Sequence, residues 1–136
     1  IPVRREEVDR QVIDTMLAVL KAGKPLLIAP EGGRSHTPGL KRGKLGVAYI
    51  VDRCHVPVVP VGIVGTTDDF LDDALHAKRP RLEMVIGKPL SLPPVTGKGN
   101  EKHASLQRNV DIIMLAIANL LPQAYRGVYT EAESLQ

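Results

Sequence analysis

Leu26-Leu27-Ile28-Ala29-Pro30-Glu31-Gly32-Gly33-Arg34-Ser35 is the stretch that decides the fold class of this 136-residue chain. Its first four residues are apolar and too few for a helix, so they predict a buried strand that ends at Pro30. Apolar residues at helical spacing precede this strand over residues 6–22 and follow the loop over residues 44–54. A strand that ends in a polar, glycine-containing loop between two helices is typical of an α/β fold, in which ligands bind at strand ends.

The remainder of the chain continues this alternation of strands and helices. Residues 56–64 are nearly all apolar and β-branched, which predicts a strand covered on both faces, while Pro57 and Pro60 interrupt its pairing. Three further elements are predicted: a helix over residues 66–75, a strand over residues 81–86, and a helix over residues 104–121 that Pro122 stops. We therefore expect an α/β fold with a central mixed sheet flanked by helices and incomplete at the N-terminus.

The composition restricts the class of protein and its partners. Apolar residues make up 43% of the chain and charged residues 24%, as in an ordinary globular domain. Aromatic residues are only 3% and tryptophan is absent, so the chain lacks the stacking platforms of single-stranded nucleic-acid binders and no nucleic-acid partner is expected. The single cysteine, Cys54, excludes an internal disulfide and a multi-cysteine metal site, which favours a cytoplasmic location. No metal or redox cofactor is expected.

Charge and hydropathy are compatible with a peripheral membrane contact. The net charge of +3 is a mild excess that suits phosphate-bearing ligands or an anionic membrane surface. The longest strongly apolar stretch, residues 112–121, is about half as long as a helix that spans a bilayer. Any membrane contact is therefore expected to be peripheral. The apolar breadth of the predicted helix 104–121 favours core packing over membrane insertion.

The loop after Pro30 has the parts of a phosphate-binding cradle. Gly32 and Gly33 allow positive φ and close approach of the backbone, while Arg34 offers a planar fork of donors and Ser35 a hydroxyl. Five cations could add positive charge around the loop: Arg4, Arg5, Lys41, Arg42 and Lys44. Taken alone, the loop is equally compatible with a surface turn that carries a solvated arginine.

The order of several short blocks resembles that of the lysophosphatidic acid and glycerol-3-phosphate acyltransferase family. The block Ile1-Pro2-Val3-Arg4-Arg5 is similar to an apolar and basic block of the family that ends in arginine shortly before a helix. Pro30-Glu31-Gly32-Gly33-Arg34-Ser35 is similar to the next block, usually Pro-Glu-Gly-Thr-Arg-Ser, with Gly33 in the place of threonine. Gly43-Lys44-Leu45-Gly46 and Val56-Pro57-Val58-Val59-Pro60-Val61 resemble the two blocks that follow. The matching motifs extend to about Thr66.

This resemblance implies an enzyme of phospholipid biosynthesis at the cytoplasmic face of the membrane. The reaction would move a fatty acyl group from acyl-CoA or acyl carrier protein to glycerol 3-phosphate or 1-acylglycerol 3-phosphate (lysophosphatidic acid). Residues implied in binding the phosphorylated acceptor are Glu31, Gly32, Gly33, Arg34, Ser35 and Lys44, assisted by Arg4 or Arg5. Pro57 and Pro60 are implied to shape the site.

The family's catalytic block is a histidine followed after four residues by an aspartate. The residues five positions after His36, His55, His76 and His103 are Lys41, Pro60, Arg81 and Arg108, so no histidine of this chain has that aspartate. We therefore expect residues 1–122 to be the C-terminal part of one acyltransferase domain whose catalytic block precedes Ile1, and residues 123–136 to be a C-terminal tail. Such a chain is expected to be inactive by itself, because it lacks the general base.

Other interpretations of the same residues stay open. A strand, a Gly-Gly-Arg loop and a helix could form a non-catalytic phosphate- or nucleotide-binding module, although the spacing of a P-loop is absent. A non-catalytic interaction domain that has kept the fold of the acyltransferase family is a further possibility. Four acidic residues could hold a divalent cation, but a solvated helix surface is favoured for them: Asp68, Asp69, Asp72 and Asp73.

Overall fold

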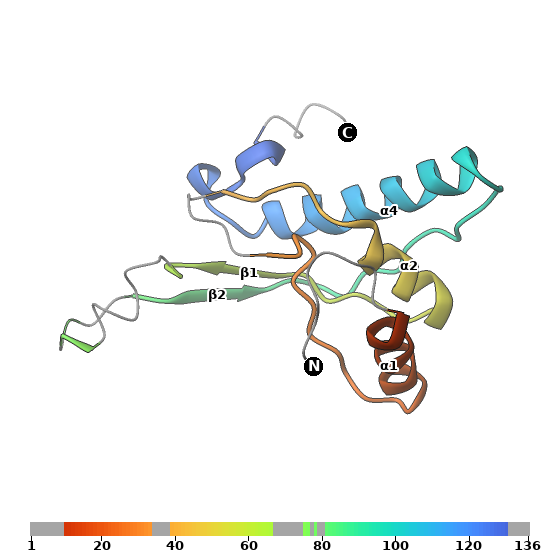
Figure 1. Cartoon of the computed structure of the whole chain (residues 1–136). Helices are drawn as coiled ribbons and strands as arrows, with labels where there is room; N and C mark the ends of the chain where they lie inside the picture. The colour runs from red at the N-terminus through yellow and green to blue at the C-terminus, as the bar shows by residue number, and fades with distance from the viewer. Residues whose placement is uncertain (1–9, 34–38, 67–74, 77, 79–80, 131–136) are drawn as a thin grey trace.

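The computed structural model describes residues 10–33, 39–66, 75–76, 78 and 81–130 (Figure 1). Its elements are, in chain order, α1 (Arg10–Lys21), α2 (Leu45–Cys54), β1 (Val61–Val64), β2 (Glu83–Ile86), α4 (Asn100–Ala118) and the 3-10 helices η1 (Gln123–Tyr125) and η2 (Gly127–Tyr129). Helices and a sheet occur together, which confirms the predicted α/β class. In the part of the chain that is described, the sheet consists of two antiparallel strands.

The two N-terminal helices lie where their apolar spacing predicts them. α1 is amphipathic and buries Val12, and it packs against α2 (Figure 1). α2 buries Ala48, Ile50 and Val51 and ends where His55 takes the left-handed conformation, with φ +53°. The backbone N–H of His55 donates to the carbonyl of Val51 over 2.7 Å, which closes the last turn of the helix.

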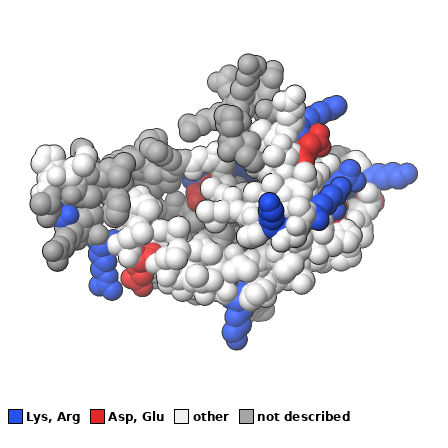
Figure 2. Space-filling view, turned by 90° about the horizontal axis from the view of Figure 1, so that it is seen from below, with Lys and Arg blue, Asp and Glu red and all other residues white. Residues whose placement is uncertain are grey.

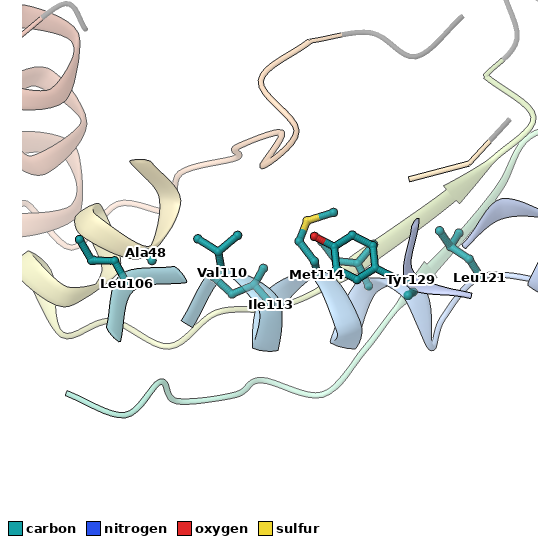
Figure 3. Packing of buried hydrophobic residues seen from close by; sticks show 9 residues of the cluster. Ala48, Leu106, Val110, Ile113, Met114, Leu121 and Tyr129 are labelled. Atoms are coloured by element: carbon teal, nitrogen blue, oxygen red, sulfur yellow. The ribbon is translucent and has the colours of Figure 1, made fainter. Parts of the chain in front are cut away.

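The hydrophobic core is built along α4, whose 19 residues make it the longest helix described. Val110, Ile113 and Met114 are almost completely buried and belong to one cluster with Ala48 of α2, which is fully buried. Figure 3 shows these side chains in one row, with the ring of Tyr129 beside Met114. The predicted helix 104–121 is thus confirmed as a core element, although it begins earlier and ends earlier than its apolar pattern indicated.

The sheet is a hairpin in which Val61 pairs with Ile86 and Ile63 pairs with Met84. An isolated bridge between Val58 and Leu90 continues the pairing, so the predicted interruption by Pro57 and Pro60 is confirmed. The C-terminal end of α4 lies beside the hairpin (Figure 1). A Cβ built on Gly62 would be 2.9 Å from Leu121 Cδ2, so glycine allows the chain that follows α4 to approach β1 closely.

Two expectations about the strands are wrong. Residues 26–29 do not form a buried strand, and Leu27 is 93% exposed. A strand is stable only when a neighbouring strand pairs with its backbone hydrogen-bonding groups, and no described strand pairs with this segment. Pro25 and Pro30, on either side of it, also lack a backbone N–H donor. The strand within residues 56–64 is not covered on both faces either, because Ile63 and its partner Met84 are 46% and 59% exposed.

Several predictions fall on residues outside the described ranges. Residues 67–74 hold most of the helix predicted over 66–75 and all four of the acidic residues considered for a cation. The basic block at residues 1–5 also lies outside them. None of the helices within the described residues is long and apolar enough to cross a membrane.

Candidate functional site

The candidate phosphate loop begins with a tight turn. The N–H of Gly32 donates to the carbonyl of Ala29 over 3.1 Å, and Pro30 occupies the second position of the turn, where its fixed φ is favoured. Gly32 has φ +72°, a conformation that side chains rarely adopt. Gly33 does not have a positive φ. Gly32 therefore adopts the positive φ that the sequence allows, whereas Gly33 does not.

The two ends of the loop meet at Lys44. Its backbone N–H donates to the carbonyl of Pro30 over 2.8 Å, which closes the loop across 14 residues of sequence. The stem of the Lys44 side chain lies over the first turn, because a Cβ built on Gly32 would be 3.1 Å from Lys44 Cγ. Lys44 is exposed, so its ammonium group is accessible to a ligand from solvent. The structure thus brings together Gly32 and Lys44, two of the residues implied in acceptor binding.

Glu31 has an intramolecular partner. Its Oε2 accepts a hydrogen bond from the backbone N–H of Lys41 over 2.7 Å, a short distance typical of a bond to a carboxylate. This contact spans the loop from its second residue almost to its end. The carboxylate therefore stabilises the shape of the loop, and a direct contact between Glu31 and the acceptor stays a prediction.

Gly33 is exposed, and a Cβ built there would meet nothing within 4 Å. Among the described residues, none would clash with the Cβ of the threonine that usually occupies this position in the family that the sequence resembles. The change from threonine to glycine thus removes a hydroxyl without being required by packing.

Of the remaining predicted site residues, four lie outside the described residues and two are the prolines before β1. Arg34, Ser35, Arg4 and Arg5 lie outside the described residues, so their roles stay predictions. Pro57 is exposed beside the Val58–Leu90 bridge. Pro60 is buried, and its carbonyl accepts the N–H of Gly87 over 2.9 Å. Both prolines thus shape the entry into the β1–β2 hairpin, and their predicted effect on the acceptor site remains a prediction.

Three cations lie at the end of the loop. Lys41, Arg42 and Lys44 are exposed at the end of the loop, just before α2. On the face seen in Figure 2, lysine and arginine side chains are spread across the surface. An anion that approaches the end of the loop would meet these three cationic side chains.

Candidate acid–base and metal groups are sparse in the described part of the chain. His55, His76 and His103 are all exposed. Within the described ranges, no cluster of three or more His, Cys, Asp or Glu side chains is arranged to hold a metal ion.

Sequence reasoning missed the elements that hold the end of the loop. Gly43 packs against α4, and its N–H donates to the hydroxyl of Tyr129 over 3.3 Å. Tyr129 lies in the stretch predicted to be a tail, yet its ring belongs to the hydrophobic core. Three apolar or aromatic residues in a short stretch were the signal available for this packing: Tyr125, Val128 and Tyr129.

Comparison with known proteins finds a family match for the segment that contains the loop, which is just under half of the chain. Residues 1–64 match the family model described as Acyltransferase. The resemblance inferred from the sequence blocks is thereby confirmed over that segment, which includes the turn at Gly32, Lys44 and the prolines before β1. No solved structure matches the chain.

Proposed function

We propose, from the premise that residues 1–64 are an acyltransferase segment, that this chain binds the phosphorylated acceptor of a glycerophospholipid acyltransferase. The reaction moves a fatty acyl group from a thioester to a hydroxyl of glycerol 3-phosphate or 1-acylglycerol 3-phosphate. The observation that carries the proposal is the closed loop, in which the Lys44 side chain lies over the Gly32 turn. This arrangement supports anion binding at a loop that lies within the matched residues 1–64.

The acceptor phosphate is proposed to bind Lys44 and Arg34. Lys44 supplies a mobile point charge, while Arg34 supplies a planar guanidinium that can donate two parallel bonds to one phosphate. Glu31 contributes indirectly, because its carboxylate is bonded to the Lys41 N–H and keeps the loop closed. The phosphate thereby holds the glycerol backbone in a fixed orientation, with its free hydroxyl available for reaction.

Acyl transfer requires a base in addition to this binding site. The acceptor hydroxyl loses its proton as its oxygen attacks the thioester carbonyl, and the carbon–sulfur bond then breaks to release a thiol. No histidine of this chain has the His-x4-Asp spacing of the family. The proposal therefore assigns acceptor binding to this chain and does not assign proton removal to any of its residues.

A peripheral location at the cytoplasmic face of the membrane is proposed as well. The lipid product and the 1-acylglycerol 3-phosphate acceptor reside in membranes, so the enzyme must work at a surface. Ile63, Met84 and Ile86 are exposed apolar side chains of the hairpin. Their exposure supports a contact with lipid, and co-sedimentation of the complete protein with anionic and neutral vesicles tests it.

The proposed function is tested first by binding and then by turnover. Isothermal calorimetry of this chain with glycerol 3-phosphate should give saturable heat, and glycerol, which lacks the phosphate, should give none. Acyl transfer by the complete protein should then depend on glycerol 3-phosphate or 1-acylglycerol 3-phosphate, with acyl-CoA and acyl carrier protein compared as donors. Tighter binding of a nucleotide than of glycerol 3-phosphate would favour the alternative of a non-catalytic nucleotide-binding module.

A further inference from the structure

Residues 39–43, which lead from the loop into α2, are enclosed by parts of the chain beyond the matched residues 1–64. On one side lies α4, because a Cβ built on Gly43 would be 2.6 Å from Val110 Cγ1 and 2.8 Å from Met114 Cγ. On the other side lies the C-terminal segment of residues 123–130, which holds η1 and η2 (Figure 1). The position of Gly43 therefore depends on elements that the family match does not include.

The backbone of the C-terminal segment pairs with the end of the loop. Leu40 donates its N–H to the carbonyl of Tyr125 over 3.1 Å and accepts the N–H of Val128 over 3.2 Å. Between these two bonds the chains approach closely, and a Cβ built on Gly39 would be 3.0 Å from Gly127 Cα. Both backbone groups of Leu40 are thus held by one short segment.

Tyr129 adds a side-chain contact to this pairing. Tyr129 is buried in the core, with its ring beside Met114 (Figure 3), and its hydroxyl accepts the N–H of Gly43 over 3.3 Å. The next amide along the chain, that of Lys44, donates to Pro30. Two consecutive amides are therefore held, one by the core and one by the start of the loop.

We propose that Tyr129 is a positioning residue for the acceptor site, acting through the Gly43 peptide on Lys44. This inference rests on the proposed function. Glycine has wide torsional freedom, so the chain at Gly43 does not by itself fix the direction in which Lys44 leaves the backbone. The hydroxyl of Tyr129, anchored in a packed core, restricts that freedom and keeps the Lys44 stem over Gly32.

Tyr129→Phe tests the proposal, because it removes the hydroxyl and leaves the ring in the core. Tyr125→Phe is a matched control in the same segment, since Tyr125 holds Leu40 through its backbone carbonyl and not through its hydroxyl. A neutral hydrogen bond is worth about 0.5–1.5 kcal/mol, so Tyr129→Phe should weaken glycerol 3-phosphate binding to this chain roughly 2- to 12-fold. Tyr125→Phe should change it less than twofold.

Two further readouts separate positioning from a general loss of stability. Amide hydrogen exchange at Gly43, measured by NMR on this chain, should be faster in Tyr129→Phe than in Tyr125→Phe. In the complete enzyme, the KM for the phosphorylated acceptor should rise, while kcat and the KM for the acyl donor stay within about twofold. A global loss of folded enzyme would instead lower the apparent kcat and leave both KM values unchanged.

The outcomes distinguish this inference from the proposed function. If wild-type chain binds glycerol 3-phosphate and Tyr129→Phe binds it as tightly as Tyr125→Phe does, the positioning role is overturned and the proposed function stands. If wild-type chain does not bind glycerol 3-phosphate, both fail together. Weaker acceptor binding confined to Tyr129→Phe, with faster exchange at Gly43, supports the positioning role.

Discussion

The stem of the Lys44 side chain lies across the backbone of Gly32, so that a Cβ added to Gly32 would stand 3.1 Å from Lys44 Cγ. The two residues are separated by the whole candidate phosphate loop, and the bond from the Lys44 N–H to the carbonyl of Pro30 joins its ends. The first turn of the loop and the first cation after it therefore form one surface. A substitution at Gly32 should therefore displace the Lys44 side chain, and a substitution at Lys44 should affect the turn at Gly32.

Gly32→Ala is expected to destabilise the loop and displace Lys44. The left-handed conformation of Gly32 costs other residues about 1–2 kcal/mol, and the added Cβ also meets the Lys44 stem. Urea unfolding should show this loss, and calorimetry should show weaker glycerol 3-phosphate binding. Gly33→Ala is the control, because its Cβ meets nothing and its φ is not positive. Equal effects of the two substitutions would contradict the contact.

Glu31→Ala should loosen the loop by removing the partner of the Lys41 N–H. The bond is exposed, so we expect a loss of roughly 1 kcal/mol in unfolding free energy and faster amide exchange at Lys41. Glu31→Gln keeps an acceptor oxygen and should lie between wild type and Glu31→Ala. An unchanged exchange rate at Lys41 in Glu31→Ala would show that the carboxylate does not hold this amide in solution.

Gly43→Ala should destabilise the protein through overpacking. The new Cβ would lie within 2.8 Å of Val110 Cγ1 and Met114 Cγ, which are fully buried, and such insertions cost about 1–3 kcal/mol. Gly46→Ala, three residues later, adds a Cβ to an exposed position of α2 with nothing within 4 Å. It should be neutral or stabilise by up to about 1 kcal/mol. Thermal unfolding of the pair measures the difference, and similar melting temperatures would argue against close packing of Gly43 on α4.

The helices could be predicted from the sequence because their stability depends on a local pattern. Val110, Ile113 and Met114 recur at helical spacing and are buried as that spacing requires. The segment 26–29 could not be judged in this way, since a strand forms only where a partner strand lies beside it. The order of the sequence blocks located the loop and Lys44. The bond between Gly43 and Tyr129 could not be found, because it joins residues 86 apart and leaves no periodic pattern.

Arg34→Lys in the complete protein should weaken use of the phosphorylated acceptor, and Arg34→Ala should weaken it further. Lysine keeps the charge but loses the planar fork, and each lost charged hydrogen bond costs about 1.5–3 kcal/mol, or roughly 10- to 150-fold in binding. Steady-state kinetics with both substrates varied should show a large rise in the acceptor KM and little change in the donor KM. Unchanged acceptor kinetics in a folded Arg34→Ala protein would remove the assignment of this side chain to the phosphate.

Residues 1–136 by themselves should bind the acceptor without turning it over. None of the four histidines has the His-x4-Asp spacing, and general-base catalysis contributes about 10²–10⁴-fold. An assay with labelled acyl-CoA or acyl carrier protein and saturating glycerol 3-phosphate should therefore stay near background. Turnover at rates typical of enzymes would show that another group of this chain acts as the base.

The contact between Gly43 and Tyr129 also constrains the order in which parts of the protein fold during synthesis. Chains emerge from the ribosome N-terminus first, at about 5–20 residues per second. The loop and α2 are synthesised before residues 125–129, which supply the pairing with Leu40 and the bond from Gly43 to Tyr129. A nascent chain that stops before Tyr129 can form α1 and α2, but it lacks the contacts that fix the end of the loop. Ligand binding should thus be acquired only after Tyr129 has been synthesised.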